Sequence, residues 1–403
     1  KGGCNVQQLG LIPTPLLSYA LPRLGLDGGV MVTASHNPPE FNGFKLWAAD
    51  GASFTKAMVQ HVEDIYFASK PAVASWKTCG QLVPADDFRP KYIEALKQQV
   101  DLDIIQKQKY KVVADCGGGA ASTVVPNLLE AVGVQSELLF CIPDGRFQNR
   151  LPEPKAENLT RLISTVKKTN ANLGMAWDGD ADRIVLVTES GRYLMGDRTF
   201  AFATYHRLRN LPTKRKRIVT QVATSDVLHD VASAVGAKLV TTCVGEPNIV
   251  SKMKEVDAQI GGEENGGVVY QGWSWTREGM LTALFILELM AQESLTLEQL
   301  DMQFPEYFQV KERIACPNSL KTPLMKRISE QVPSDMECEL IDGVKLRSPA
   351  GWVLLRPSGT EPIFRVFAEA KTKNHAKDLV NKGISMTNDA LREVQRSSNH
   401  RSE

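Results

Sequence analysis

The sequence has 403 residues, of which 43% are hydrophobic and 23% are charged, and its formal net charge is +1. Because domains cluster at roughly 100–150 residues, three or four compact units are expected. The near-zero net charge excludes the broad basic field of a protein that binds nucleic acid or anionic membranes. The seven cysteines are widely spaced and form no CxxC pair, so we expect no disulfide framework and no zinc site.

No signal peptide or membrane-spanning segment is predicted. The most apolar stretch, residues 281–291, is too short to cross a bilayer and contains Glu288. Together with the cysteine usage, this predicts a cytoplasmic protein with no membrane and no nucleic-acid partner.

Strand-like and helix-like segments alternate through the first three quarters of the chain. The strand-like runs, the first of which is expected to be buried, are residues 29–33, 111–115, 184–188, 218–222 and 238–242. Such alternation predicts parallel sheets with helices on both faces. Near residue 297 the pattern changes to four strand-like runs and two long helical segments, which predicts a C-terminal α+β domain.

A Ser-His-Asn-Pro turn follows the first strand-like run. Ser35 stands at the carboxyl end of that run, where α/β sheets bind their ligands. His36 is placed to relay a proton, and the ammonium group of Lys45 is placed to neutralise a phosphate on the serine. An ordinary turn with a surface histidine explains this string about equally well.

The strongest signal is a set of three carboxylates at alternate positions, Asp178, Asp180 and Asp182. Such a cluster repels itself unless a hard cation binds to it, and oxygen ligands suit Mg²⁺ or Ca²⁺. An EF-hand is disfavoured because Arg183 stands where that loop needs glycine and because the flanks are strand-like. A solvated acidic turn is the other alternative. We therefore predict a Mg²⁺ site with a phosphate-binding arginine, Arg183, beside it.

Two further strings suit sugar and phosphate binding. Glu263 and Asn265 lie in a glycine-rich segment and offer the acceptors and donors that vicinal hydroxyls require. Residues 356–362 combine an arginine, two hydroxyls and free N–H groups into an anion cradle, and Arg365 follows on the next strand-like run. Ordinary turns remain an alternative for both strings.

In this order, the strings TASHNP, DGDADR, GEENGG and RPSGTEP resemble the α-D-phosphohexomutase superfamily, which includes phosphoglucomutase/phosphomannomutase and phosphoglucosamine mutase. The resemblance covers nearly the whole chain. It implies three related α/β domains and a smaller C-terminal α+β domain around a central cleft. The expected domains, which carry the phosphoserine, metal, sugar-binding and phosphate-binding loops in turn, are residues 1–105, 106–212, 213–296 and 297–403.

The resemblance also implies an activity, that of an isomerase which interconverts hexose 1-phosphate and hexose 6-phosphate. The reaction would use a phosphoserine, Mg²⁺ and a hexose 1,6-bisphosphate that serves as intermediate and activator. Its partner would be a small phosphosugar, and the chain would be a monomer or a homodimer.

Individual roles follow from the matching strings. Ser35 would carry the phosphoryl group and would hold Mg²⁺ together with Asp178, Asp180 and Asp182. Lys45 would assist proton transfer, with His36 beside it. The residues expected to bind the substrate are Arg183, Gly245, Glu246, Glu263, Asn265, Arg356, Ser358, Gly359, Thr360 and Arg365.

The sequence departs from the family pattern in ways that bear on activity. Many members have GExSGH in the sugar loop, where Asn265 and Gly267 here replace the serine and the histidine, so proton transfer shifts toward Lys45. Little precedes the stretch at residues 8–15, so the first domain is expected to be truncated and to expose a sheet edge. A catalytically silent sugar-phosphate-binding protein is therefore an alternative, and a serine phosphatase or phosphotransferase is a third. No string identifies the sugar.

Overall fold

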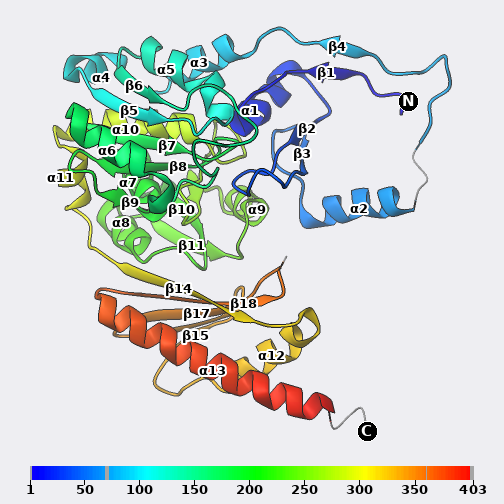
Figure 1. Ribbon diagram of the computed structural model, residues 1–403, viewed down its shortest axis with the longest axis vertical. Helices are drawn as coiled ribbons and strands as arrows, with labels where there is room; N and C mark the ends of the chain where they lie inside the picture. Colours follow the sequence, from blue (N-terminus) through cyan, green and yellow to red (C-terminus); the bar gives the residue numbers. More distant parts are fainter. Residues whose placement is uncertain (1, 69–71, 360, 400–403) are drawn as a thin grey trace.

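The computed structural model describes residues 2–68, 72–359 and 361–399. Three groups of α/β elements form a body, and an α+β domain that begins at β14 (Phe308–Ala315) lies against it (Figure 1). One continuous hydrophobic core runs through the body from Ile12 to Phe304, and a separate core fills the C-terminal domain. Among the described residues, no helix combines the length and the apolar character that a bilayer crossing requires.

The metal loop belongs to a five-stranded sheet of order β6-β5-β7-β8-β9. The parallel strands are β5 (Lys111–Asp115), β6 (Gln135–Leu139) and β7 (Leu173–Trp177), and the antiparallel ones are β8 (Ile184–Thr188) and β9 (Tyr193–Leu194). Every residue of β7 and β8 is buried, which explains why they read as unbroken apolar runs. The helices that precede and accompany this sheet are α3 (Arg89–Lys97), α4 (Leu102–Gln108), α5 (Val125–Ala131) and α6 (Thr160–Thr169).

The sugar loop belongs to a four-stranded sheet of order β11-β10-β12-β13. Its strands are β10 (Arg217–Gln221), β11 (Lys238–Thr242), β12 (Ile260–Gly262) and β13 (Val268–Tyr270), of which the last is antiparallel. The accompanying helices are α7 (Gly196–Leu208), α8 (Val227–Val235), α9 (Glu246–Val256), α10 (Gly279–Glu293) and α11 (Leu297–Asp301). Helix α10 is buried from Gly279 to Ala291, so its apolar surface on all sides packs inside the body.

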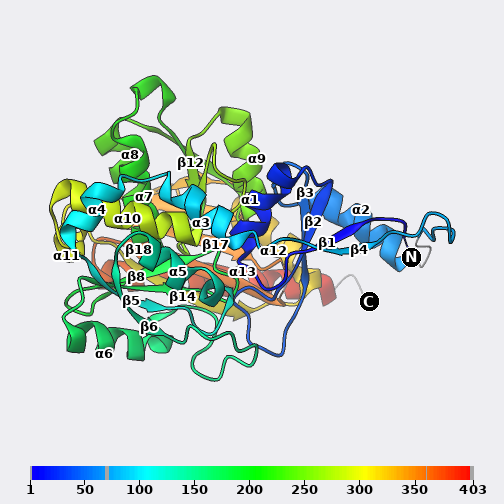
Figure 2. The same ribbon diagram turned by 90° about the horizontal axis from the view of Figure 1, so that it is seen from above.

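The first α/β region contains two small sheets. Strand β1 (Val6–Gln8) pairs with β4 (Leu82–Pro84), and β2 (Gly28–Val32) pairs with β3 (Phe44–Ala48). Its helices are α1 (Thr14–Leu24), which packs into the body, and α2 (Lys56–Phe67), which has no buried residue and projects from it (Figures 1 and 2). The expectation of a buried strand at residues 29–33 is wrong. Val30 and Val32 are more than half exposed because, among the described residues, β2 has a single neighbouring strand.

The C-terminal domain is an antiparallel sheet of order β14-β18-β17-β16-β15 with two helices against it. The α+β character, four of the strands and both helices were predicted from the sequence, and the strand at residues 337–339 was not. The remaining strands are β15 (Glu337–Glu339), β16 (Val344–Ser348), β17 (Gly351–Pro357) and β18 (Ile363–Ala370). The helices are α12 (Asn318–Glu330) and α13 (Lys373–Asn399).

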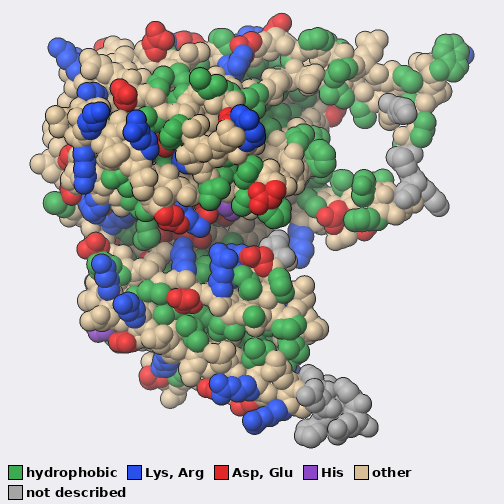
Figure 3. All heavy atoms as spheres, in the orientation of Figure 1, with side chains coloured by type: hydrophobic (Ala, Val, Ile, Leu, Met, Phe, Trp, Pro, Cys, Tyr) green, Lys and Arg blue, Asp and Glu red, His purple; other side chains and the backbone are tan. Residues whose placement is uncertain are grey.

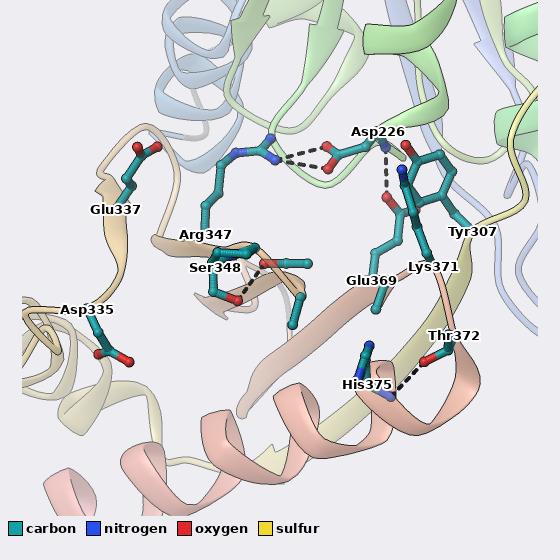
Figure 4. A pocket seen from close by; sticks show the side chains of 14 residues that line it. Asp226, Tyr307, Asp335, Glu337, Arg347, Ser348, Glu369, Lys371, Thr372 and His375 are labelled. Carbon is teal, nitrogen blue, oxygen red and sulfur yellow. Dashed lines mark hydrogen bonds and ion pairs between the residues drawn. The ribbon is translucent and has the colours of Figure 1, made fainter.

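Polar contacts join the C-terminal domain to the body beside a cavity of about 710 Å³ (Figure 4). Arg347 Nη1 lies 3.0 Å from both carboxylate oxygens of Asp226, the residue that precedes α8. The Asp226 N–H donates to Glu369 Oε1 at 2.7 Å, and Trp352 Nε1–H donates to the same oxygen at 3.1 Å. These bonds tie strands β16, β17 and β18 to one end of one helix, so they set how the domain sits on the body.

Replacing Arg347 is expected to weaken the attachment of the C-terminal domain to the body. Arg347→Met leaves the Asp226 carboxylate without its cation, which costs about 1–3 kcal/mol of unfolding free energy. Chemical denaturation and limited proteolysis measure the effect. Arg327→Met, which removes exposed ion pairs within the C-terminal domain, is the control and is expected to change little. Equal effects of the two substitutions would contradict a role for Arg347 at the junction.

Candidate active site

The aspartate loop is the turn between β7 and β8, and it carries the three carboxylates predicted to bind a metal. Asp178, Asp180 and Asp182 are buried, and each offers an oxygen within 4.8 Å of the others'. Asp180 Oδ1 and Asp182 Oδ1 are buried without a hydrogen-bond donor. The strands on both sides exclude an EF-hand, and buried carboxylate oxygens that lack donors suit a hard divalent cation.

The pKa values of two carboxyls in this loop, Asp178 and Asp182, are shifted in opposite directions. Burial raises the pKa of the Asp178 carboxyl far above its usual range, and the charges of Asp182 and Asp180 raise it further. Burial also acts to raise the pKa of Asp182, but Arg277 and Lys45 outweigh it and hold this pKa well below its usual range. Asp182 therefore depends on cations from elsewhere in the chain to stay ionised in the interior.

Ser35 lies against this loop. Its Oγ donates to Asp178 Oδ2 at 3.3 Å, although 143 residues separate the two. The backbone of Ser35 is left-handed, with φ 55°, and its N–H donates to Thr33 Oγ1 at 2.8 Å, which fixes the turn after β2. A Cβ atom at position 179 would overlap the carbonyl oxygen of Ser35, so Gly179 permits the close approach. The structure thus brings together the serine and the carboxylates that the sequence placed in two separate motifs.

Lys45 and His36 are two basic residues near Ser35, and they differ in charge. Lys45 Nζ, on β3, lies 2.6 Å from Asp180 Oδ2 and 3.2 Å from Asp182 Oδ2. Burial lowers the pKa of Lys45, but these two carboxylates outweigh it and raise that pKa above its usual range, so the lysine is a cation. Burial, followed by the charge of Arg183, lowers the pKa of His36 to about 4. His36 is therefore neutral near pH 7, and its Nδ1 is buried without a partner.

The sugar loop follows β12 and lies beside the aspartate loop. Ile184 N–H, at the end of the aspartate loop, donates to Gly266 O at 3.3 Å. Within the sugar loop, Asn265 Nδ2–H donates to Glu263 Oε2 at 3.2 Å, and Gly267 N–H donates to Asn265 Oδ1 at 3.1 Å. Burial acts to raise the pKa of Glu263, but Arg277 outweighs it and holds the pKa below its usual range, so Glu263 is ionised.

Gly245 and Glu246 stand at the start of α9. Gly245 has φ 117°, which favours glycine, and Glu246 begins the helix. The Glu246 carboxylate is buried and accepts hydrogen bonds from Ser53 Oγ at 3.0 Å and from Thr276 Oγ1 at 3.1 Å. Its oxygens therefore already have donors from the protein.

The phosphate-binding loop connects β17 and β18. Arg356 Nε–H donates to Asp342 Oδ2 at 2.9 Å, and the Ser358 side chain is buried while Gly359 is exposed. Arg365 Nη2–H donates to Glu361 Oε2 at 2.8 Å. Thr360, predicted to bind phosphate, lies outside the described residues.

A cavity of about 590 Å³ lies between the aspartate loop, the sugar loop and strands β14 and β18. It is lined by Arg183 of the aspartate loop, Asn265 of the sugar loop and Arg365 beside the phosphate-binding loop. Lys311 and Arg313 of β14 also line it. Of the predicted site residues, Ser35, Arg356, Ser358 and Gly359 do not line it. Figure 3 shows the surface hollowed between the body and the C-terminal domain, with Lys and Arg side chains along the hollow. Ser35 adjoins Asp178, which is bonded in turn to the backbone N–H of Arg183 at 3.2 Å.

Several residues that contact the predicted site residues were not predicted from the sequence. Thr14 Oγ1–H donates to Asp180 Oδ2 at 2.7 Å, and Arg277 Nη2 lies 2.5 Å from Asp182 Oδ2. Lys321 Nζ donates to the carbonyl oxygens of Ser358 at 2.5 Å and Glu361 at 2.6 Å, which supports the phosphate-binding loop. The signal available for Arg277 was a basic residue two positions before a mostly apolar helix. Thr14 and Lys321 have no comparable local signal.

Comparison with known sequences identifies the family. Sequence profiles of phosphoglucomutase/phosphomannomutase α/β/α domains I, II and III match residues 1–72, 90–191 and 195–307, and that of the C-terminal domain matches residues 302–382. A phosphoglucomutase/phosphomannomutase of Thermococcus kodakarensis is 38% identical over 97% of this chain and 85% of its own length. A phosphoglucosamine mutase of Methanococcus vannielii is 34% identical over 97% of this chain and 87% of its own length.

Solved structures agree with the sequence comparison. The crystal structure of a phosphoglucomutase/phosphomannomutase family protein from Burkholderia thailandensis matches with a TM-score of 0.85. It is 25% identical, and the match covers 98% of this chain and 84% of that one. The order of the domains, the convergence of their loops and the sequence relatives lead to one assignment. The chain belongs to the phosphoglucomutase/phosphomannomutase family of the α-D-phosphohexomutase superfamily and is a phosphohexomutase, an isomerase.

Proposed function

We propose that the chain interconverts hexose 1-phosphate and hexose 6-phosphate through a phosphoserine at Ser35 and a hexose 1,6-bisphosphate intermediate. The observation that carries the proposal is the 3.3 Å approach of Ser35 Oγ to the buried aspartate loop. Relatives named phosphoglucomutase/phosphomannomutase and phosphoglucosamine mutase support the reaction class. A cytoplasmic location and a monomeric or homodimeric state stay predictions from the sequence.

The aspartate loop fits Mg²⁺. Its three carboxylates converge, and two of their oxygens are buried without donors, which is the donor set that a hard cation requires. Asp178, Asp180 and Asp182 would hold the ion together with the phosphate on Ser35. When bound, the ion supplies neutralisation of the charge on the transferring phosphoryl group.

The neighbouring residues supply further positive charge beside the aspartate loop. A phosphoserine carries close to two negative charges, and the Lys45 ammonium, fixed by Asp180 and Asp182, places a positive charge beside the same loop. The attacking sugar hydroxyl must lose a proton as its oxygen bonds to phosphorus. His36 is the neutral titratable neighbour of Ser35, whereas Lys45 is held protonated. We therefore assign charge neutralisation to Lys45, in place of the proton transfer that the sequence predicted for it.

The separate phosphate-binding loop suits a substrate that carries two phosphates in turn. Arg356, Ser358, Gly359 and Arg365 would hold the phosphate that is not reacting, while the other faces Ser35. Glu263 and Asn265 would bind sugar hydroxyls in either orientation, since the amide and carboxylate offer both donors and acceptors. The cavity of about 590 Å³ between the loops is in the usual range for small-molecule sites.

Removing the serine hydroxyl tests the phosphoryl carrier. The wild-type chain is expected to isomerise at least one of glucose, mannose and glucosamine 1-phosphates in the presence of a trace of the matching 1,6-bisphosphate. Ser35→Ala removes the oxygen that carries the phosphoryl group, so the rate is expected to fall by roughly 10³-fold or more, because unaided phosphate esters react very slowly. Coupled assays for the 6-phosphate product, together with intact-protein mass spectrometry for the covalent phosphate, measure both effects.

Ser75→Ala, in an exposed loop, is the matched control and should keep both the activity and the phosphate. Full activity of Ser35→Ala would contradict the mechanism. Binding of all three sugars without turnover by the wild type would favour the silent binding protein, and release of inorganic phosphate would favour a phosphatase.

Asp180→Asn tests the metal site. The substitution removes one negative charge from the cluster, so about 10-fold more Mg²⁺ is expected for half-maximal activity. A Mg²⁺ titration of the isomerase rate measures this shift. Asp64→Asn, on the exposed face of α2, is the control and should leave the titration unchanged. A titration for Asp180→Asn that overlays the wild type would remove Asp180 from the metal site.

A further inference from the structure

One guanidinium contacts three carboxylates that come from three different segments. Arg277, between β13 and α10, places Nη2 at 2.5 Å from Asp182 Oδ2 of the aspartate loop. Its Nη1 contacts Glu263 Oε2 of the sugar loop. Its Nε lies 3.1 Å from Glu246 Oε2 at the start of α9. The sequence analysis assigned a role to each of the three carboxylates and none to the arginine that joins them.

The position of Arg277 is fixed by burial and by the sugar loop. Only about a tenth of its side chain is exposed. A Cβ atom at position 267 would overlap Arg277 Cδ, so the backbone of the sugar loop passes directly over the stem of the arginine. Gly267 is therefore the residue that allows the guanidinium to reach both loops at once.

The other partners of Asp182 and Glu263 show how much each loop depends on Arg277. Lys45 is a second cation on Asp182, so Asp182 keeps a partner without Arg277. The other hydrogen bond to the Glu263 carboxylate comes from the neutral amide of Asn265. The charge of Arg183 also lowers the pKa of Glu263, but among the described residues Arg277 is the charged group that donates a hydrogen bond to it. Loss of the guanidinium would thus affect the sugar loop more than the aspartate loop.

We propose that Arg277 is a positioning residue that orients Glu263 for the sugar and limits the affinity of the aspartate loop for a divalent cation. The inference rests on the proposed function and extends it to a residue outside the four recognised strings. A positive charge beside Asp182 opposes a second cation at the same carboxylate, whereas the same charge holds Glu263 ionised and in place. Removal of Arg277 should therefore change the two affinities in opposite directions.

The test measures both affinities at equilibrium in the full-length chain. Isothermal titration calorimetry gives the Kd for Mg²⁺ and, separately, the Kd for the sugar 1-phosphate that the wild type prefers. For Arg277→Met we expect the sugar-phosphate Kd to rise about 10-fold or more, because Glu263 loses its charged donor. The Kd for Mg²⁺ should fall several-fold. In kinetics, KM should rise by a larger factor than kcat falls.

Two further variants keep the proposal testable if Arg277→Met fails to fold. Arg277→Lys keeps the charge but loses the planar fork, so it should preserve the Mg²⁺ affinity and still weaken sugar-phosphate binding. Gly267→Ala displaces the stem of Arg277 without removing its charge, so it should also preserve the Mg²⁺ affinity and weaken sugar-phosphate binding. Arg198→Met is the control, since it removes a largely buried guanidinium paired with Asp301 in another part of the body. It should lower the Tm and leave both Kd values unchanged.

The outcomes separate this inference from the proposed function. Weaker Mg²⁺ binding in Arg277→Met, or an unchanged Kd for the sugar phosphate, would overturn the positioning role even in an active mutase. If the wild type binds sugar phosphate without isomerising it, the proposed function fails, while opposite shifts in the two Kd values would still support the role of Arg277.

Discussion

The buried negative charge of the aspartate loop is the constraint on which the rest of the site depends. Three carboxylates that offer oxygens within 4.8 Å of one another are stable in an interior only beside cations. The chain supplies those cations from distant segments, with Lys45 from β3 and Arg277 from the segment before α10. Thr14, at the start of α1, adds a hydroxyl donor to Asp180. The same contacts that balance the charge therefore hold the three α/β regions of the body together.

This arrangement also explains how motifs that are distant in the sequence come to lie side by side. The close approach of Gly179 to Ser35 fixes the serine loop on the aspartate loop, and the hydrogen bond from Ile184 to Gly266 fixes the sugar loop beside it. The C-terminal domain brings Arg365 to the cavity through a junction of a different kind, in which Arg347 and Glu369 bind one end of α8. The body is therefore joined by ion pairs to buried carboxylates and by close backbone contacts at the site itself, whereas the C-terminal domain is joined by polar contacts away from it.

The sequence predicted those features that depend on local chemistry. Buried central strands read as apolar runs, so β5 and β8 were located, and the spacing of Asp178, Asp180 and Asp182 predicted converging carboxylates. Features that depend on neighbours distant in sequence could not be predicted. The partners of Arg277 and Lys321 are set by the topology. The exposure of Val30 arises because β2 pairs only with β3 among the described residues, whereas the apolar run alone indicated a buried strand.

The central claim is that a phosphorylated serine and three aspartates share one divalent cation. The most direct measurement is anomalous diffraction from crystals of the phosphorylated protein soaked with Mn²⁺ as a substitute for Mg²⁺. The account predicts one strong peak at roughly 2–2.3 Å from oxygens of Asp178, Asp180, Asp182 and the Ser35 phosphate. A strong peak elsewhere with none at the aspartate loop, or an unmodified Ser35 in the active enzyme, would contradict it.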